Sequence, residues 1–161
     1  AFKKGQSPPL NAVVLLGSYE MMQRMVLNES VAVDRADPKT GRSAIFNAVE
    51  AGHVDMIRFL LERGLGVNTR DNVGWTVLGA AVAARQGLAV EFLINRSADV
   101  MQRLQNDSTA LHVAAAAGGS REANALLVAK ADPNALDYMG RSPMHFCLTA
   151  QVAELLMGYG A

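Results

Sequence analysis

Helix-capping residues recur at a constant spacing along this chain. Ser43, Thr76, Thr109 and Ser142 lie 33 residues apart. Each is part of a similar nine-residue phrase: GRSAIFNAV (41–49), GWTVLGAAV (74–82), DSTALHVAA (107–115) and GRSPMHFCL (140–148). A looser copy precedes them at 7–30. A period of about 20 to 50 residues is typical of repeated units that stack into an elongated domain.

Each unit carries the signals of two short helices. Serine and threonine are good N-cap residues because their hydroxyls accept an otherwise unpaired backbone N–H. Pro9 and Pro143 fall where a first helical residue is expected, and proline is tolerated there. We expect a first helix over 44–51, 77–84 and 110–117, with Gly17, Gly52 and Gly118 as helix ends. A second helix follows, and a turn rich in Gly, Asn and Asp, such as 65–75, suits a hairpin-like loop.

Composition favours closely packed helices. Hydrophobic residues make up 50% of the chain but aromatic residues only 6%, so short side chains supply most of the apolar mass. A β-sandwich would favour branched and aromatic residues instead. One unit cannot bury both of its helices alone, so we expect stability to come from the stacking of neighbouring units.

The repeated phrases resemble those of the ankyrin-repeat family. The nearest matches are TALHVAA (109–115) and ADPNA (131–135), and the resemblance covers residues 7 to 161. It implies an all-α solenoid of helix-turn-helix units joined by β-hairpin-like fingers. The predicted domain is single, with repeats at 7–41, 42–74, 75–107, 108–140 and, shortened, 141–161.

Two units depart from the pattern. In the last unit, Leu155 and Leu156 arrive several residues early, so either a tighter link joins its helices or residues are missing. In the third unit, Arg85 replaces the helix-ending glycine, and we expect Gly87 to end the helix instead. Cys147 falls where the other units have alanine (Ala48, Ala81 and Ala114), which predicts a packed interior position.

Two asparagines follow the second helices at equivalent positions. The resemblance implies that Asn68 and Asn134 tie their hairpins together, with asparaginyl hydroxylation as the alternative role. Met101 occupies this position in the unit between them, so we expect a looser finger there. Before the first unit, Phe2 is expected to fold against that end of the stack.

Charge and cysteine content narrow the function. Lys+Arg and Asp+Glu are equal at 15 each, which argues against bulk binding to nucleic acid or to an anionic membrane. A single cysteine excludes an intrachain disulfide and favours a reducing compartment. We therefore expect an intracellular protein, cytoplasmic or alternatively nuclear. No apolar run approaches the roughly 18 residues of a membrane span, so we expect no membrane insertion, and we expect a monomer.

Trp75 is the clearest candidate for partner binding. It is the only tryptophan, between a hairpin glycine and a capping threonine, and the resemblance places that position on the concave, partner-facing side. Trp, Tyr and Arg dominate interface hot spots. The predicted protein-binding residues are Arg42, Arg70, Asn72, Trp75, Arg103, Tyr138, Met139 and Arg141. Arginine binds carboxylates through paired donors, which favours an acidic partner segment.

The same residues have a structural alternative. The Trp75 ring would then lie flat on the adjacent finger, and the finger arginines would pair with Asp71, Asp107 and Asp137. The first helices should present mostly small residues to the groove: Glu50, Ala51, Ala83, Ala84, Ala116, Ala117, Thr149 and Ala150.

No catalytic or metal chemistry is indicated. The chain contains no GxGxxG, GxxxxGK[ST], HExxH or GxSxG motif. His112 and His145 lie 33 residues apart, and the resemblance implies that this histidine bonds the backbone of a neighbouring finger. We expect no enzymatic activity, no cofactor and no metal. Two alternatives stay open: a regulatory or targeting segment of a larger enzyme, channel or effector protein, and recognition of a phosphorylated small molecule or nucleotide by the Arg/Trp/Tyr rim.

Overall fold

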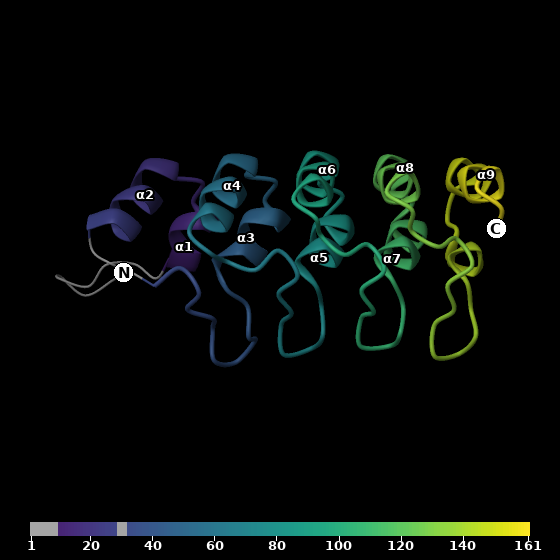
Figure 1. Cartoon of the computed structure of the whole chain (residues 1–161), viewed down its shortest axis with the longest axis horizontal. Helices are drawn as coiled ribbons and strands as arrows, with labels where there is room; N and C mark the ends of the chain where they lie inside the picture. Colours follow the sequence, from purple (N-terminus) through teal and green to yellow (C-terminus); the bar gives the residue numbers. More distant parts are fainter. Residues whose placement is uncertain (1–9, 29–31) are drawn as a thin grey trace.

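The computed structural model describes residues 10–28 and 32–161, which form pairs of helices stacked in one row (Figure 1). The inner helix of each pair is α1 (Leu10–Leu15), α3 (Ala44–Glu50), α5 (Val77–Ala83), α7 (Ala110–Ala117) or the 3-10 helix η1 (Pro143–Phe146). The outer helices are α2 (Tyr19–Asn28), α4 (Val54–Glu62), α6 (Gly87–Asn95), α8 (Ser120–Val128) and α9 (Ala150–Gly158). The predicted all-α solenoid is confirmed. The expectations for Phe2 and Pro9 lie outside the described residues.

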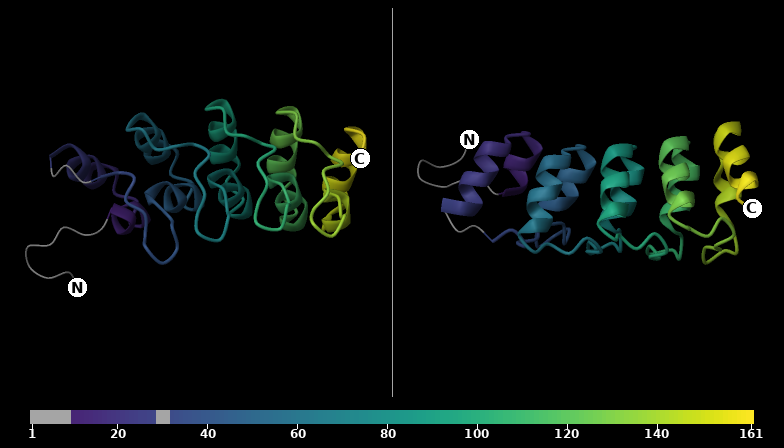
Figure 2. Two further views of the ribbon diagram at one scale, coloured as in Figure 1. Left: turned by 60° about the horizontal axis from the view of Figure 1, so that its bottom comes forward. Right: turned by 45° about the horizontal axis from the view of Figure 1, so that its top comes forward.

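Long loops join each outer helix to the next inner helix. We call them the first (32–43), second (63–76), third (96–109) and fourth (129–142) fingers. All four project from the same edge of the row (Figures 1 and 2). They are hairpin-like in path, but over the described residues no β-strand forms. A single antiparallel bridge joins Arg70 to Thr76.

The core lies between consecutive pairs of helices. Each inner helix packs on the next, from α1 through α3, α5 and α7 to η1. Ala48, Ala81 and Ala114 are fully buried at these contacts, and their small side chains let the helices approach closely. The outer helices add larger buried residues, including Leu60, Leu93, Leu126 and Leu156, on the sides that face the row.

The turn after α5 corrects one prediction. The inner helices α3 and α7 end with Gly52 and Gly118 at φ +72° and +64°, in the left-handed region that favours glycine. Arg85 adopts the same conformation at φ +56°. Gly87 is not the helix end that we expected, because it is already the first residue of α6. Outside glycine, this conformation costs about 1–2 kcal/mol.

The last unit is built on a tighter link. Its inner helix is a single 3-10 turn with Pro143 at its start, and only residues 147–149 separate η1 from α9. The backbone N–H of Leu148 donates to the carbonyl of Ala115 in α7, at 3.3 Å. Cys147 packs against the core as expected, but it is only partly buried and not interior, because the 3-10 turn ends before the alanine position of the other units. Burial still raises the pKa of this thiol.

A second set of ties runs along the base of the fingers. The side-chain oxygen of Asn68 accepts the N–H of Asp99 at 2.9 Å, and Asn134 donates to the carbonyl of Gly160 at 2.9 Å. These asparagines therefore tie one unit to the next rather than closing their own hairpins. At the equivalent position, the sulfur of Met101 lies 3.3 Å from the backbone nitrogen of Asp132 and accepts that N–H.

Candidate partner-binding surface

The inner helices and the fingers together border one continuous side of the row. Its floor consists of small exposed residues on successive inner helices and at the start of α9: Ala51, Ala83, Ala116 and Ala150. Its wall consists of the fingers, which come forward in the left view of Figure 2. We call this side the binding face. Ala51, Ala83, Ala116 and Ala150 are exposed and have short side chains, whereas Glu50, another predicted groove position, is ion-paired with Arg42.

A pocket of about 360 Å³ opens on the binding face. Two fingers and two inner helices contribute to its lining: Trp75, Leu104, Gln105, Asn106, Ser108, His112, Val113, Ala116 and Phe146. Most of these contacts are apolar or aromatic. The pocket is therefore suited to an apolar group rather than to an ion.

Trp75 forms part of the pocket wall and is half-buried. Its backbone N–H donates to Asp71 Oδ1 at 2.8 Å, which fixes the turn that carries the ring. The ring packs against the core and lies beside Gly79 at the start of α5. The ring therefore packs on the start of the helix that follows it, α5, and also forms part of the pocket wall.

Arg42 is held by two carboxylates of its own fold. Its Nε lies 2.9 Å from Asp71 Oδ2 and its Nη1 lies 2.7 Å from Glu50 Oε1. Burial alone would raise the pKa of Asp71, but hydrogen bonds from Arg42, Trp75 and Val73 lower it below its ordinary value. Arg42 therefore fastens the first finger to the second.

Arg141 repeats this arrangement within the fourth finger. Its Nη2 lies 2.8 Å from Asp137 Oδ2, and its guanidinium carbon sits 4.6 Å from the centre of the Phe146 ring. Burial alone would raise the pKa of Asp137, but hydrogen bonds from Arg141 and Met139 lower it. The positive charge of Arg141 is thus neutralised by a buried carboxylate.

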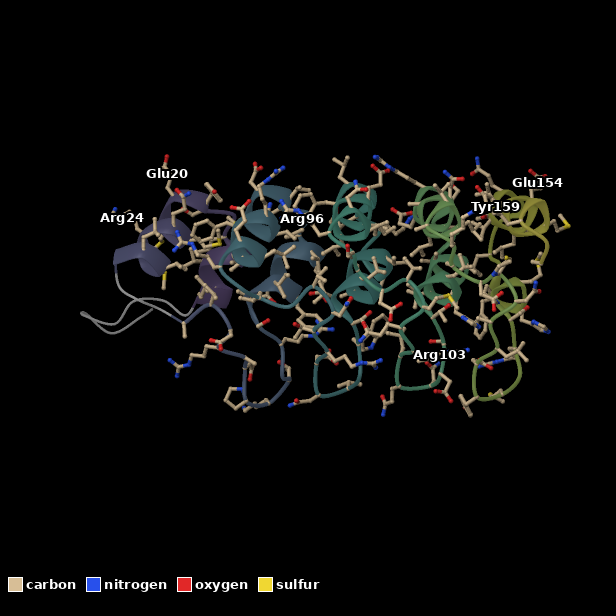
Figure 3. The ribbon with its side chains drawn as sticks, in the orientation of Figure 1. Glu20, Arg24, Arg96, Arg103, Glu154 and Tyr159 are labelled. Carbon is tan, nitrogen blue, oxygen red and sulfur yellow. The ribbon has the colours of Figure 1, made fainter. Side chains whose placement is uncertain are left out.

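Arg70 and Arg103 differ from Arg42 and Arg141 because, among the described residues, they bond only carbonyl groups. Arg70 Nη1 lies 3.4 Å from the carbonyl oxygen of Gly74. Arg103 Nη1 donates to the carbonyls of Asp107 and, across to the next finger, Leu136. Within the described part of the chain neither forms an ion pair, and Asp107 does not pair as predicted. Figure 3 labels Arg103 among the fingers, away from Arg96, which directly follows α6.

The remaining predicted residues lie at finger tips. Asn72 donates its backbone N–H to Thr40 at 2.9 Å, and Tyr138 donates its own to Asn106 at 3.1 Å. The side chains of Tyr138 and Met139 are 67% and 59% exposed. The backbone of each tip therefore supports its neighbour, while the side chains of the fourth tip stay available for contact.

His112 has the structural role that the resemblance implied. Its Nδ1 lies 3.1 Å from the backbone nitrogen of Thr109, and its Nε2 lies 3.0 Å from the carbonyl oxygen of Arg141. Burial lowers the pKa of His112, and the guanidinium groups of Arg103 and Arg141 add to the lowering. Around His112 and elsewhere in the described ranges, no three His, Cys, Asp or Glu side chains gather as a metal site.

The pocket residues that sequence reasoning missed include Leu104, Val113 and Phe146. Leu104 left a usable signal. The second and fourth fingers have aspartate at the equivalent position (Asp71 and Asp137), and both carboxylates are tied up in their own turns. At this position Leu104 replaces the turn-forming aspartate of those two fingers, and its side chain forms part of the pocket wall. Phe146 lies one 33-residue period after Val113, and both residues line the pocket.

A stacked helical repeat with an open, finger-lined face defines the class of protein, and comparison with known proteins identifies the family. The family model described as "Ankyrin repeats (3 copies)" matches residues 10–103 and 81–161. The chain belongs to the ankyrin-repeat family.

Individual relatives match a smaller part of this chain than the family model does. Neurogenic locus notch homolog protein 1 of Danio rerio is 35% identical over 127 residues, which is 76% of this chain and 5% of that protein. The Xenopus laevis protein of the same name is 36% identical over 109 residues, 67% of this chain and 4% of its own length. Neurogenic locus notch homolog protein 2 of Homo sapiens is 33% identical over 127 residues, with shares of 76% and 5%. The chain thus spans about 5% of the length of these relatives.

Among the helices of residues 10–28 and 32–161, none has the length and apolar character needed to cross a membrane.

Proposed function

We propose that this chain is a non-catalytic protein-interaction domain that binds its partner on the binding face. Ankyrin repeats are generally protein–protein interaction modules, and a stack of repeats presents an extended concave surface. The observation that carries the proposal is the pocket of about 360 Å³ with Trp75 and Phe146 in its wall. Buried interface anchors are most often aromatic or arginine side chains seated in such pockets.

The charge on the fingers supports a partner segment with acidic residues. Arg42 and Arg141 already have carboxylate partners, so their role is to hold the fingers in place and to offer the edges of their guanidinium groups to the partner. Arg70 and Arg103 bond only neutral carbonyls and keep their charge for a partner. The proposed contact set is completed by Asn72 and Trp75 on the second finger and by Tyr138 and Met139 on the fourth.

We also propose that the domain serves a longer protein as a regulatory or targeting segment inside the cell. Its relatives are many times longer than the part they share with it. We propose that this domain is monomeric. We also propose that its repeats span residues 7–41, 42–74, 75–107, 108–140 and 141–161.

The test is capture of partners from a lysate of the source by two matched double variants. One, Ala83→Glu with Ala116→Glu, places carboxylates on the floor of the binding face, where both alanines are exposed. The other, Leu88→Glu with Val128→Glu, changes exposed residues of the outer helices, which are 62% and 61% accessible. We expect the first variant to lose at least about tenfold of a specific partner, as loss of a hot spot does, and the second to retain it. Loss from the outer-helix variant alone would refute the proposal.

A second candidate is recognition of a nucleotide or another planar phosphorylated molecule. The aromatic wall of the pocket favours it, since bases stack on aromatic side chains. Trp75 is the sole tryptophan, so a titration with ATP and GTP can be followed by its fluorescence. A fluorescence signal that saturates at micromolar nucleotide would support this candidate, and an unchanged spectrum would remove it.

A further inference from the structure

The pocket has an apolar body and a polar finger side. Val113 and Ala116 of α7 form part of its floor, and Trp75, Leu104 and Phe146 supply most of the remaining apolar lining. On the finger side, the hydroxyl of Ser108 donates to Asn106 Oδ1 at 2.6 Å, so these two groups already satisfy each other. An occupant therefore gains mainly from apolar and aromatic contact.

The volume limits the size of the occupant. Ligand pockets range from about 300 to about 1,000 Å³, so one of about 360 Å³ lies at the small end of this range and has room for an aromatic side chain. The rings of Trp75 and Phe146 favour an aromatic occupant, because offset or edge-to-face aromatic pairs gain attraction beyond the area that they bury.

Charged side chains lie close to His112, which lines the pocket. The charged groups that act on the His112 ring are the cations Arg103 and Arg141 and the anion Asp137. Arg141 and Asp137 compensate each other through their ion pair. Arg103 is left with two carbonyl partners and no carboxylate, so a carboxylate beside the pocket would complete its bonding.

The floor on either side of the pocket admits an extended chain. Ala83 precedes Ala116 by one 33-residue period, and Thr149 follows it by another. All three positions are exposed and carry small side chains. A peptide backbone can therefore run along the inner helices while one of its side chains enters the pocket.

We propose that the pocket receives one aromatic side chain of an extended partner segment, and that Arg103 pairs with a carboxylate next to that residue. This inference rests on the proposed function and specifies the kind of segment that the binding face recognises. The aromatic ring supplies the affinity, and the carboxylate sets which aromatic residue of the partner is chosen.

The probe is a capped five-residue peptide with a central phenylalanine flanked on each side by aspartate. Phenylalanine is not excited at the long wavelengths that excite tryptophan, so the fluorescence of Trp75 reports occupancy of the pocket. Replacing the phenylalanine by alanine should weaken binding by about tenfold or more, as loss of a hot-spot anchor does. Replacing both aspartates by asparagine should weaken it about two- to fivefold, the range of an exposed charge pair.

Two variants of the 161-residue chain test the assignment, each with a matched control. Ala116→Leu fills the pocket, whereas Ala83→Leu makes the same change one period earlier on the floor, outside the pocket lining. Arg103→Gln removes the charge, whereas Arg24→Gln removes one at an exposed position of the outer helix α2, away from the binding face. We expect Ala116→Leu to abolish detectable peptide binding, whereas Ala83→Leu, on the floor beside the pocket, should weaken it far less. Arg103→Gln should weaken the aspartate peptide about two- to fivefold but not the asparagine peptide.

Several results would overturn the assignment. Equal loss from Ala116→Leu and Ala83→Leu would place the contact on the open floor instead of in the pocket. Binding of free 3-phenylpropionate as tight as that of the peptide would make the site one for small molecules. The two proposals fail separately: if the floor variant loses its captured partner while Ala116→Leu does not affect the peptide, the pocket assignment is wrong and the binding face stands. The melting temperature of each variant shows that it is folded.

Discussion

The Nε2 atom of His112 lies 3.0 Å from the carbonyl oxygen of Arg141, so a side chain of α7 holds the fourth finger in place. The other ring nitrogen, Nδ1, lies 3.1 Å from the backbone nitrogen of Thr109. A backbone N–H only donates, so Nδ1 is the acceptor and the proton of the neutral ring sits on Nε2. One imidazole therefore caps its own helix and joins it to the next unit.

We predict that His112→Ala lowers the free energy of unfolding by about 1–3 kcal/mol, because buried polar groups on both sides of the ring lose their partner. The matched control is His145→Ala. His145 makes the same bond within its own turn, to the backbone nitrogen of Ser142 at 3.1 Å, but its ring is exposed. We expect a loss of only about 0.5–1 kcal/mol there, as for an ordinary cap. Urea denaturation measures both values, and equal losses would contradict the bridging role.

Stability should fall as the pH drops below about 6.5, the ordinary pKa of histidine in an unfolded chain. Burial lowers the pKa of His112 in the folded state, so at mildly acidic pH the unfolded chain binds a proton that the folded chain does not. The contribution of the neutral ring is complete above about pH 6.5 and is lost as the pH falls towards the folded pKa, with a slope of at most about 1.4 kcal/mol per pH unit. His112→Asn should flatten this slope between pH 7 and pH 5 in denaturation experiments. An unchanged slope would assign the effect to other groups.

Two finger glycines allow the cost of a left-handed backbone conformation to be measured apart from the cost of steric crowding. Gly41 and Gly140 have similar angles, φ +70° and +74°. A Cβ at Gly41 would lie 2.7 Å from the backbone nitrogen of Asn72, whereas at Gly140 no atom of the described residues lies within 4 Å. We predict that Gly140→Ala costs about 1–2 kcal/mol from the left-handed conformation alone. Gly41→Ala should cost about 1–3 kcal/mol more, because the first and second fingers must move apart. Thermal unfolding of both variants checks the difference.

Met101→Asn should stabilise the chain by about 0.5–1 kcal/mol, because a thioether sulfur is a weaker acceptor than an amide oxygen. The change restores at the third finger the bond that Asn68 makes to the next unit. Met139→Asn is the control, since Met139 is exposed at a finger tip and its side chain bridges no finger. A lower free energy of unfolding for Met101→Asn would show that the sulfur contributes through packing instead.

The fold was largely predictable because the signals for it are local and recur. The N-cap residues Ser43, Thr76, Thr109 and Ser142 each mark the start of a helix as expected, and the predicted first helices agree with α3, α5 and α7 to within one residue. The errors came from departures without a local signal. Arg85 adopts the left-handed conformation that glycine adopts at the equivalent positions of the neighbouring units, and an arginine gives no sequence signal for this conformation.

The candidate site was harder to predict because it depends on which partners the side chains choose. Four of the predicted binding residues are arginines of the fingers, but only the folded structure shows that Arg42 and Arg141 meet buried carboxylates while Arg70 and Arg103 meet carbonyls. The pocket likewise needs Leu104 and Phe146 brought together from separate units. Periodicity locates a position on the surface, but it does not determine the contacts made there.

The ties between fingers also affect how the chain folds. Arg103 reaches Leu136 across 33 residues, and His112 reaches Arg141 across 29. Each such contact closes a loop of nearly constant size, so the entropy cost of closure does not rise with the length of the array. Folding can begin at any adjacent pair of units and spread outward by adding one neighbour at a time. A longer array would gain stability with every added unit, yet no contact in it would be slower to find.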